Sequence, residues 1–120
     1  MHELSIAQSI LSIAEQALPK KNVVITGVHL QIGELSGIEI EALTFALSVI
    51  KENTVLDRAE LDIEVVKGEA ECLECKTIFP MDHFGSCCPQ CKGYFVKVLK
   101  GRDMKVLNLT VEEQESSIIT

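Results

Sequence analysis

Two Cys-x-x-Cys pairs, separated by twelve residues, constrain this chain more than any other feature of its sequence. Cys72 and Cys75 form the first pair, and Cys88 and Cys91 form the second. A turn with this spacing presents both sulfurs on one side, so two such turns complete the tetrahedron of four thiolates that Zn(II) prefers. Because four protein ligands leave no open position for a substrate, we expect this zinc site to be structural or modulatory rather than catalytic.

Other kinds of site also use paired cysteines. A thiol redox pair needs one Cys-x-x-Cys at a helix N-terminus that follows a strand, and an iron–sulfur cluster can also take four thiolates. The two short, knuckle-like turns favour zinc over both. Two neighbouring residues have open roles. Cys87 is a surplus thiol beside Cys88, and His83 is either a loop residue or an additional ligand.

Composition limits the class of protein. A chain of 120 residues with 47% hydrophobic residues suits one compact unit with a small subdomain. Five cysteines clustered in one segment fit a metal site better than a disulfide framework. The net charge of −7 argues against nucleic acid as the partner. Apolar runs fall short of the roughly 20 residues of a membrane span, and no signal peptide is evident, so we expect a cytoplasmic protein.

The apolar pattern predicts an α+β fold around the cysteine segment. Residues 4–18 have helical periodicity, and residues 23–32, 60–66 and 104–111 alternate as strands do. A capping box from Ser36 to Glu39 predicts a second helix that begins at Ser36. We therefore expect a three-stranded mixed sheet packed against two helices. Residues 1–67 and 101–120 form this domain, and residues 68–100 are inserted as a zinc-binding subdomain.

The aromatic residues are concentrated beside the cysteines. Phe79, Phe84, Tyr94 and Phe95 flank the two pairs, and we expect them to pack around the metal site. Gly93 follows the second pair at a position that suits a tight turn.

The first three residues offer a second kind of metal site. The amine of Met1 and the amide nitrogen of His2 can close a five-membered chelate ring, and the His2 imidazole closes a six-membered one. Such a nitrogen-rich tetragonal set prefers Ni(II) or Cu(II). The fourth donor is the amide of Glu3, its carboxylate, or a distant histidine such as His29 or His83. Taken alone, a histidine at position 2 is more often an ordinary surface residue.

Several short motifs occur in register along the chain. They are Met1-His2-Glu3-Leu4-Ser5, Gly33-Glu34-Leu35-Ser36-Gly37, Asn53-Thr54-Val55-Leu56 with Ala59-Glu60-Leu61, and the two cysteine turns. With the predicted order of helix, strand, helix, strand, zinc insertion and strand, the chain resembles the HypA/HybF family of hydrogenase nickel-incorporation proteins over its whole length.

This resemblance implies a nickel metallochaperone rather than an enzyme. It implies Ni(II) binding by Met1, His2 and Glu3, and a zinc-ribbon or rubredoxin-like subdomain held by the two cysteine pairs. The implied partners are a nickel-handling GTPase and the large subunit of [NiFe]-hydrogenase, with urease as a second recipient in some relatives. No nucleic acid or membrane is implied. We expect a monomer, with a homodimer formed by strand exchange as the alternative.

Two other functions compete with nickel delivery. A zinc-ribbon adaptor without a transported metal would explain the lysines that follow Cys91, and a thiol oxidoreductase would oxidise Cys72 and Cys75 reversibly.

Overall fold

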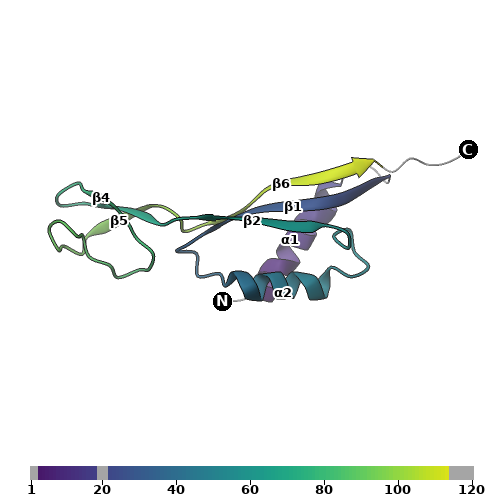
Figure 1. Ribbon diagram of the computed structural model, residues 1–120, viewed down its shortest axis with the longest axis horizontal. Coiled ribbons are helices and arrows are strands. Elements are labelled where there is room, and N and C mark those ends of the chain that lie inside the picture. The colour runs from purple at the N-terminus through teal and green to yellow at the C-terminus, as the bar shows by residue number, and fades with distance from the viewer. Residues whose placement is uncertain (1–2, 19–21, 114–120) are drawn as a thin grey trace, which may run out of the picture. The chain divides into compact units, whose positions relative to one another are not determined.

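A computed structural model describes residues 3–18 and 22–113, and Figure 1 shows how its helices and strands follow one another. In chain order the elements are α1 (Glu3–Ala17), β1 (Val23–Gly33), α2 (Ile40–Ile50), β2 (Glu60–Val66), β3 (Glu69–Cys72), β4 (Ile78–Pro80), β5 (Val96–Lys100) and β6 (Met104–Glu113). They form two three-stranded sheets, with the strand orders β2-β1-β6 and β4-β3-β5. Met1 and His2, which carry most of the predicted nickel site, lie outside the described residues.

The chain divides into two compact units. Unit 1 contains the chain up to Leu30, Ile38–Asp62 and the chain from Val106 on. Unit 2 contains Gln31–Gly37 and Ile63–Lys105, and therefore all of the cysteines. The domain boundaries proposed from the sequence, with residues 68–100 as the insertion, stay a prediction.

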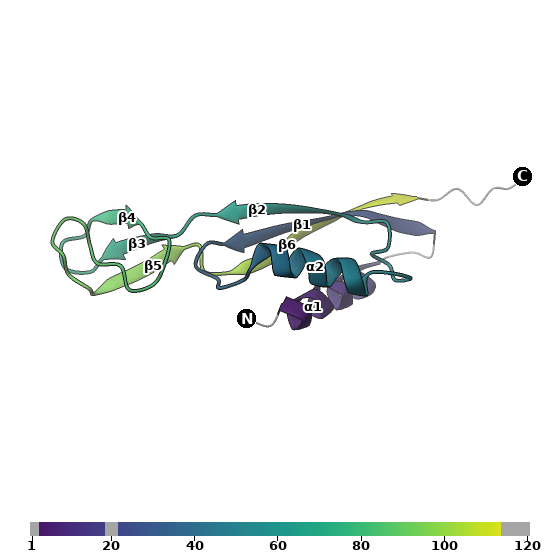
Figure 2. The ribbon, with the colours of Figure 1, turned by 60° about the horizontal axis from the view of Figure 1, so that its bottom comes forward.

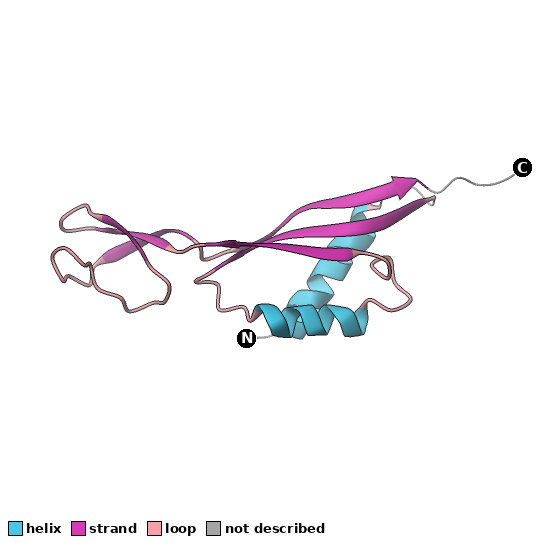
Figure 3. Ribbon diagram, viewed as in Figure 1, coloured by secondary structure: helices cyan, strands magenta, loops and turns pink. Residues whose placement is uncertain are grey.

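Unit 1 has the predicted α+β architecture. Strands β1 and β2 run in the same direction and β6 runs against them, so the sheet is mixed (Figure 2). Both helices lie on the same face of the sheet (Figure 3). The buried core of this unit comes from α1 (Ala7, Ile10, Ala14), α2 (Leu43, Ala46, Leu47) and β1 (Val23, Ile25, Val28, Leu30). Burying each large aliphatic side chain contributes about 1.5–3 kcal/mol, which makes this apolar layer the main stabilising feature of the unit.

The predicted helix over residues 4–18 is confirmed as α1. Its buried residues are spaced by three and four positions, as on one face of a helix. The predicted strands are confirmed as β1, β2 and β6, each with small differences at the ends. No helix within residues 3–18 and 22–113 is long and apolar enough to cross a bilayer.

The predicted start of the second helix is wrong. Gly37 has a φ of +79°, a left-handed conformation that cannot continue a helix, so α2 begins only at Ile40. The side chain of its N-cap residue, Glu39, makes no capping hydrogen bond. Instead the backbone N–H of Glu39 donates to Oε2 of Glu3 in α1, at 3.0 Å. A carboxylate at the start of one helix therefore caps the other helix, a contact that no local capping motif encodes.

Three glycines bring three chain segments of unit 2 together. A Cβ at Gly33 would collide with the backbone of Gly101, and a Cβ at Gly101 would lie 2.6 Å from the Cα of Gly68. Hydrogen bonds hold the same junction, because the Gly68 N–H donates to Oε1 of Glu34 at 2.9 Å and the Leu35 N–H donates to the Gly101 carbonyl at 2.6 Å. Larger residues would force these backbones apart.

The core of unit 2 contains two of the cysteines. Strand β3 pairs antiparallel with β4 and with β5, and its alternation buries Ala70 and Cys72 on one face. The buried cluster consists of Leu35, Ala70, Cys72, Phe79, Met81 and Cys88, with Val96 and Val98 packed against it. A small apolar core of this kind depends on additional cross-links for its stability.

The expected packing of the aromatic residues is correct only for Phe79. Phe84, Tyr94 and Phe95 are 56%, 72% and 69% exposed. Because Val96 and Val98 of β5 pack against the core, strand alternation directs Phe95 to the opposite face. Leu35, which is distant in sequence, packs in the core together with Phe79.

Candidate metal centre

The four cysteines of the two pairs converge in unit 2. Their sulfurs all lie within 4.8 Å of one another. The Cys72 and Cys91 sulfurs are 3.5 Å apart, and the Cys75 and Cys88 sulfurs are 3.6 Å apart. A tetrahedral zinc with bonds of about 2.3 Å would place its sulfurs ~3.8 Å apart. The spacing and the soft donor set therefore fit one zinc ion with little movement.

The first pair forms a knuckle, a tight turn closed by backbone hydrogen bonds. The N–H of Lys76 donates to the Cys72 carbonyl at 2.9 Å, and the N–H of Cys72 donates to the Thr77 carbonyl at 2.8 Å. Lys76 has a left-handed φ of +68°, which turns the chain back after Cys75.

The second pair repeats this geometry. The N–H of Lys92 donates to the Cys88 carbonyl at 2.8 Å, the N–H of Cys88 donates to the Gly93 carbonyl at 2.8 Å, and Lys92 has a φ of +64°. The left-handed residue is therefore Lys92 and not Gly93. Space around Gly93 is limited, because a Cβ there would displace the exposed Glu74 carboxylate and lie 3.3 Å from the Cys91 sulfur.

Each knuckle has one buried and one exposed sulfur ligand. Cys72 and Cys88 are fully buried in the apolar cluster, whereas Cys75 and Cys91 are exposed. Each short sulfur–sulfur contact joins a buried cysteine of one knuckle to the exposed cysteine of the other. Two of the four cysteines are thus held in the core of unit 2, and the other two are accessible to solvent.

The thiols of this cluster have shifted proton affinities. A hydrogen bond with the Thr77 hydroxyl, helped by the Thr77 backbone N–H, lowers the pKa of Cys75 to about 6. The Gly93 N–H acts in the same direction on Cys91, but the Cys72 sulfur, desolvation and the other two thiols outweigh it and raise the pKa of Cys91 to about 12. Neighbouring thiolates repel one another, so the cluster holds protons until a cation replaces them.

Cys87 and His83 lie outside the group of four. Cys87 is a half-buried free thiol. His83 is exposed, and its ring nitrogens lie 2.6 Å from Oδ1 of Asp82 and 3.3 Å from Oγ of Ser86. Among the described residues, the metal-ligating cluster consists of the four predicted cysteines.

His29 joins the three strands of the first sheet. Its Nδ1 lies 3.0 Å from Oδ2 of Asp62 in β2, and its Nε2 lies 3.0 Å from Oγ1 of Thr110 in β6. Both ring nitrogens therefore have polar partners, and these contacts link β1 to the strands on either side of it.

Of the predicted nickel ligands, Glu3 is the one within the described residues. It is the first residue of α1, and its carboxylate accepts the Glu39 N–H at 3.0 Å. The starts of α1 and α2 therefore lie together at the point where the chain continues to Met1 and His2.

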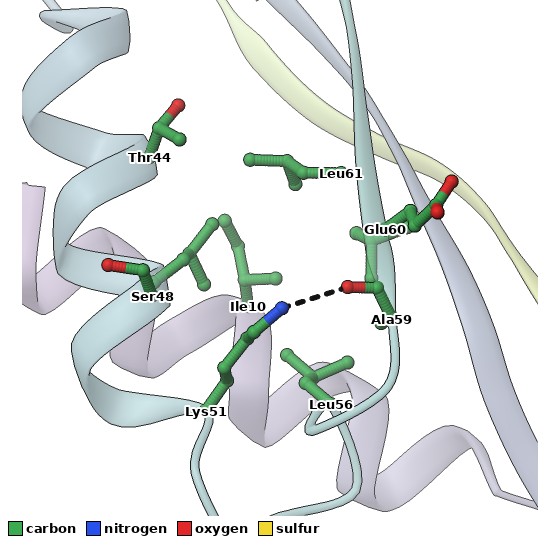
Figure 4. A pocket seen from close by; sticks show the side chains of 10 residues that line it. Ile10, Thr44, Ser48, Lys51, Leu56, Ala59, Glu60 and Leu61 are labelled. Carbon is green, nitrogen blue, oxygen red and sulfur yellow. Dashed lines mark hydrogen bonds between the residues drawn. The ribbon is translucent and has the colours of Figure 1, made fainter.

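A pocket of about 100 Å³ lies in unit 1 between α1, α2 and β2 (Figure 4). Ile10, Leu56 and Leu61 give it an apolar lining. The Lys51 amine at its edge donates to the Ala59 carbonyl at 3.1 Å, and the Ser48 hydroxyl donates to a carbonyl of its own helix. The Lys51 bond thus stabilises the connection between α2 and β2, whereas the Ser48 bond lies within α2. The residues that line the pocket include no cysteine or histidine, so they lack the donors of a zinc site.

Sequence reasoning missed two contributors to the metal centre. Leu35 packs in the cysteine core, and the Thr77 hydroxyl lies 3.1 Å from the Cys75 sulfur. The sequence does contain a signal for Thr77, because it lies two residues after Cys75 and a hydroxyl so close to a thiolate can donate a hydrogen bond to it. Leu35 gave no comparable signal, because it lies 37 positions before Cys72 in the sequence.

Known proteins resemble this chain along nearly all of its length. The family profile described as hydrogenase/urease nickel incorporation, metallochaperone, hypA matches residues 1–111. Among curated proteins, hydrogenase maturation factor HypA of Parabacteroides distasonis is 39% identical over 95% of this chain and 100% of its own length. The protein of the same name from an Azoarcus species is 39% identical over 92% of this chain and 98% of its own length.

Solved structures agree with these matches. The solution structure of the Ni metallochaperone HypA from Helicobacter pylori superposes with a TM-score of 0.64 at 29% identity, covering 95% of this chain and 98% of its own. A second solution structure of a HypA protein has a TM-score of 0.64 at 30% identity, with 98% of each chain covered.

Proposed function

This chain belongs to the HypA family of hydrogenase and urease nickel-incorporation metallochaperones, and we propose that it binds Ni(II) at its N-terminus and delivers it during maturation of [NiFe]-hydrogenase. The observation that carries the proposal is the family match from residue 1 to residue 111, which includes both the N-terminal motif and the four converging cysteines. Urease is the alternative recipient.

The chemistry of the first residues supports the nickel site. The Met1 amine, the His2 amide nitrogen and the His2 imidazole are three nitrogen donors on consecutive backbone positions, a set that suits Ni(II) in tetragonal geometry. Glu3 starts α1 directly after them, and the first amides of a helix do not donate within the helix. A Ni(II) ion held in this way keeps open positions for transfer, as a carrier requires.

The contacts of the remaining candidates favour Glu3 as the source of the fourth donor. His29 has partners on both ring nitrogens, and so does His83. Glu3 follows His2 directly in the chain, so its amide and its carboxylate are the donors adjacent to the chelating residues. Its carboxylate also accepts the Glu39 N–H at 3.0 Å.

The four cysteines bind Zn(II) in a structural role in this proposal. All four positions of a tetrahedral ion are taken by protein sulfurs, so the ion has no position for nickel or a substrate. The two buried sulfurs belong to the apolar core of unit 2, so zinc binding and folding of this unit are coupled.

The proposed role is that of a cytoplasmic carrier and not of a catalyst. Its partners are a nickel-handling GTPase, which supplies energy from nucleotide hydrolysis, and the hydrogenase large subunit. The description of the family as metallochaperones and the five free cysteines, which suit a reducing compartment, support this role. The monomer is the proposed working form, with a strand-exchanged homodimer as the alternative, and neither nucleic acid nor membrane is part of the proposal.

A second candidate function, a zinc-ribbon adaptor, is favoured by the exposed aromatic residues of unit 2. Tyr94 and Phe95 stand beside Lys92 and Lys97 in the chain, and the Arg102 guanidinium lies 5.9 Å from the centre of the Phe84 ring. Aromatic and basic side chains together can stack on and neutralise nucleic acid. Salt-dependent binding to single-stranded RNA would support this function, against the charge of −7.

The proposal is tested by blocking the N-terminus. Calorimetric nickel titration of the chain with a free Met1 amine should give one tight site, and the N-acetylated chain should lose it, because acetylation removes the first donor. Zinc content should be equal in both forms. Equal nickel binding by the acetylated chain would move the site elsewhere and favour the adaptor.

A further inference from the structure

The two cysteine knuckles have nearly the same backbone and differ in one side chain. Each has the same pair of closing hydrogen bonds, a left-handed lysine after its second cysteine, one buried sulfur and one exposed sulfur. The residue two positions after the exposed cysteine is Thr77 in the first knuckle and Gly93 in the second. The side chains at these equivalent positions are a hydroxyl-bearing group and a hydrogen atom.

The Thr77 hydroxyl gives Cys75 a contact that Cys91 lacks at the matching position. Its Oγ1 lies 3.1 Å from the Cys75 sulfur, and a hydroxyl beside a thiolate acts as the donor. A Cβ at Gly93 would lie 3.3 Å from the Cys91 sulfur and would displace the exposed Glu74 carboxylate of the first knuckle.

Exposure restricts attack by solutes to these two sulfurs. Cys72 and Cys88 are fully buried, and Cys75 and Cys91 are the exposed members of the cluster. A hydrogen bond to a thiolate withdraws electron density and lowers its nucleophilicity. The Glu74 carboxylate and the Cys91 sulfur both lie close to the position that a Cβ at Gly93 would take. The negative charge of this carboxylate has the opposite effect on the Cys91 sulfur.

We propose that Cys91 is the most electrophile-reactive ligand of the metal centre, and that Thr77 is a positioning residue whose hydroxyl protects Cys75. This inference rests on the zinc centre of the proposed function. It makes Cys91 the modification site at which small alkylating electrophiles first open the centre.

The test is the alkylation rate of individual cysteines in the zinc-loaded, full-length chain. The probe is iodoacetamide, with Cys87→Ser as the background so that the fifth thiol does not compete. In the reaction the sulfur attacks the methylene carbon, a carbon–sulfur bond forms, iodide leaves, and the sulfur is lost as a ligand. Peptide mass spectrometry after short reaction times gives the rate at each position.

We expect Cys91 to react on the order of 3- to 10-fold faster than Cys75, the range that one hydrogen bond to the sulfur accounts for. Thr77→Val keeps the shape and removes the hydroxyl, so it should raise the Cys75 rate to that of Cys91. Thr77→Ser keeps the hydroxyl and should leave Cys75 slow.

Equal rates at Cys75 and Cys91 in the parent chain, or an unchanged Cys75 rate in Thr77→Val, would overturn the proposal. The ratio of the Cys91 and Cys75 alkylation rates is measured in the chain that keeps Thr77. It therefore tests the proposal even if Thr77→Val folds poorly. Zinc content measured before alkylation distinguishes a failure of the proposed zinc centre from a failure of the proposed difference in reactivity. A chain that holds no zinc contradicts the proposed structural centre, whereas a zinc-loaded chain with equal rates contradicts this inference alone.

Discussion

The two proposed metal-binding regions of this molecule differ in where their donors come from. The four sulfurs of unit 2 belong to two turns that the fold brings together, and two of them are buried beside Leu35 and Phe79. The proposed nickel donors are consecutive at the start of the chain, where Glu3 begins α1. A metal held by dispersed side chains is coupled to folding, whereas a metal held by adjacent backbone and side-chain donors can leave without unfolding the protein. In the proposed function, this contrast distinguishes a structural zinc ion from a transported nickel ion.

The largest expected effect comes from removing a buried sulfur. Cys88→Ser should abolish zinc binding and unfold unit 2, because structural zinc contributes on the order of 10 kcal/mol to the folding of small domains. Zinc analysis and amide NMR spectra would show the loss, with the signals of α1 and α2 retained. Cys87→Ser, one position away and outside the group of four, is the matched control and should keep its zinc. A unit 2 that stays folded without zinc in Cys88→Ser would contradict the coupling between zinc binding and the folding of this unit.

His2→Ala should have the opposite effect, because it should weaken metal binding without changing the stability of the fold. Nickel affinity should fall at least about 100-fold, because an imidazole donor is lost, while unfolding free energy changes by less than ~0.5 kcal/mol. Calorimetry and chemical denaturation measure the two quantities. His83→Ala removes an exposed imidazole of unit 2 and should leave both unchanged. A nickel affinity that survives in His2→Ala would exclude the N-terminal site.

Leu35→Ala should lower the stability of the zinc-binding unit 2 and leave the nickel site unchanged. Leu35 is 6% exposed and packs in the cysteine cluster, so its truncation should lower the stability of unit 2 by about 2–4 kcal/mol through lost burial and a cavity. Zinc should be released faster to a chelator, and nickel binding should not change. The exposed Leu73 provides the control, since Leu73→Ala removes the same atoms from a solvated position. Equal release rates in the two variants would contradict the role given to Leu35.

The smallest expected effect concerns the contact between the helix starts. Glu3→Ala removes the acceptor of the Glu39 N–H and should lower the free energy of unfolding by about 1 kcal/mol, as the loss of a helix cap does. Glu3→Gln keeps an acceptor oxygen and should cost less. Urea denaturation measures the difference, with Glu15→Ala in the exposed part of α1 as the control. A loss of nickel affinity in Glu3→Gln would identify the carboxylate, and not the amide, as the fourth donor.

Regular periodicity and ligand spacing made much of this structure predictable. The apolar spacing of α1, the alternation of β2 and the two Cys-x-x-Cys turns each depend on residues within one element, so the sequence pattern records them directly. The resemblance to the HypA/HybF family is confirmed by the family match.

The errors arise where contacts are distant in sequence. Ser36 to Glu39 has the letters of a capping box, but the left-handed Gly37 interrupts it and Glu3, 36 positions from Glu39, supplies the cap. Phe95 was expected at the metal site because it is close in sequence, yet strand alternation exposes it and Leu35 packs in the core. Local patterns cannot report which distant segment fills a core or caps a helix.

The most direct test of the central claim is a count of both metals in one sample. The chain is loaded with zinc and nickel, separated from free ions by gel filtration and analysed for both elements, in parallel with His2→Ala. We expect one zinc and one nickel per native chain, and one zinc without nickel in His2→Ala. Nickel that replaces zinc in the native chain, or that stays bound in His2→Ala, would contradict the division into a structural and a transported metal.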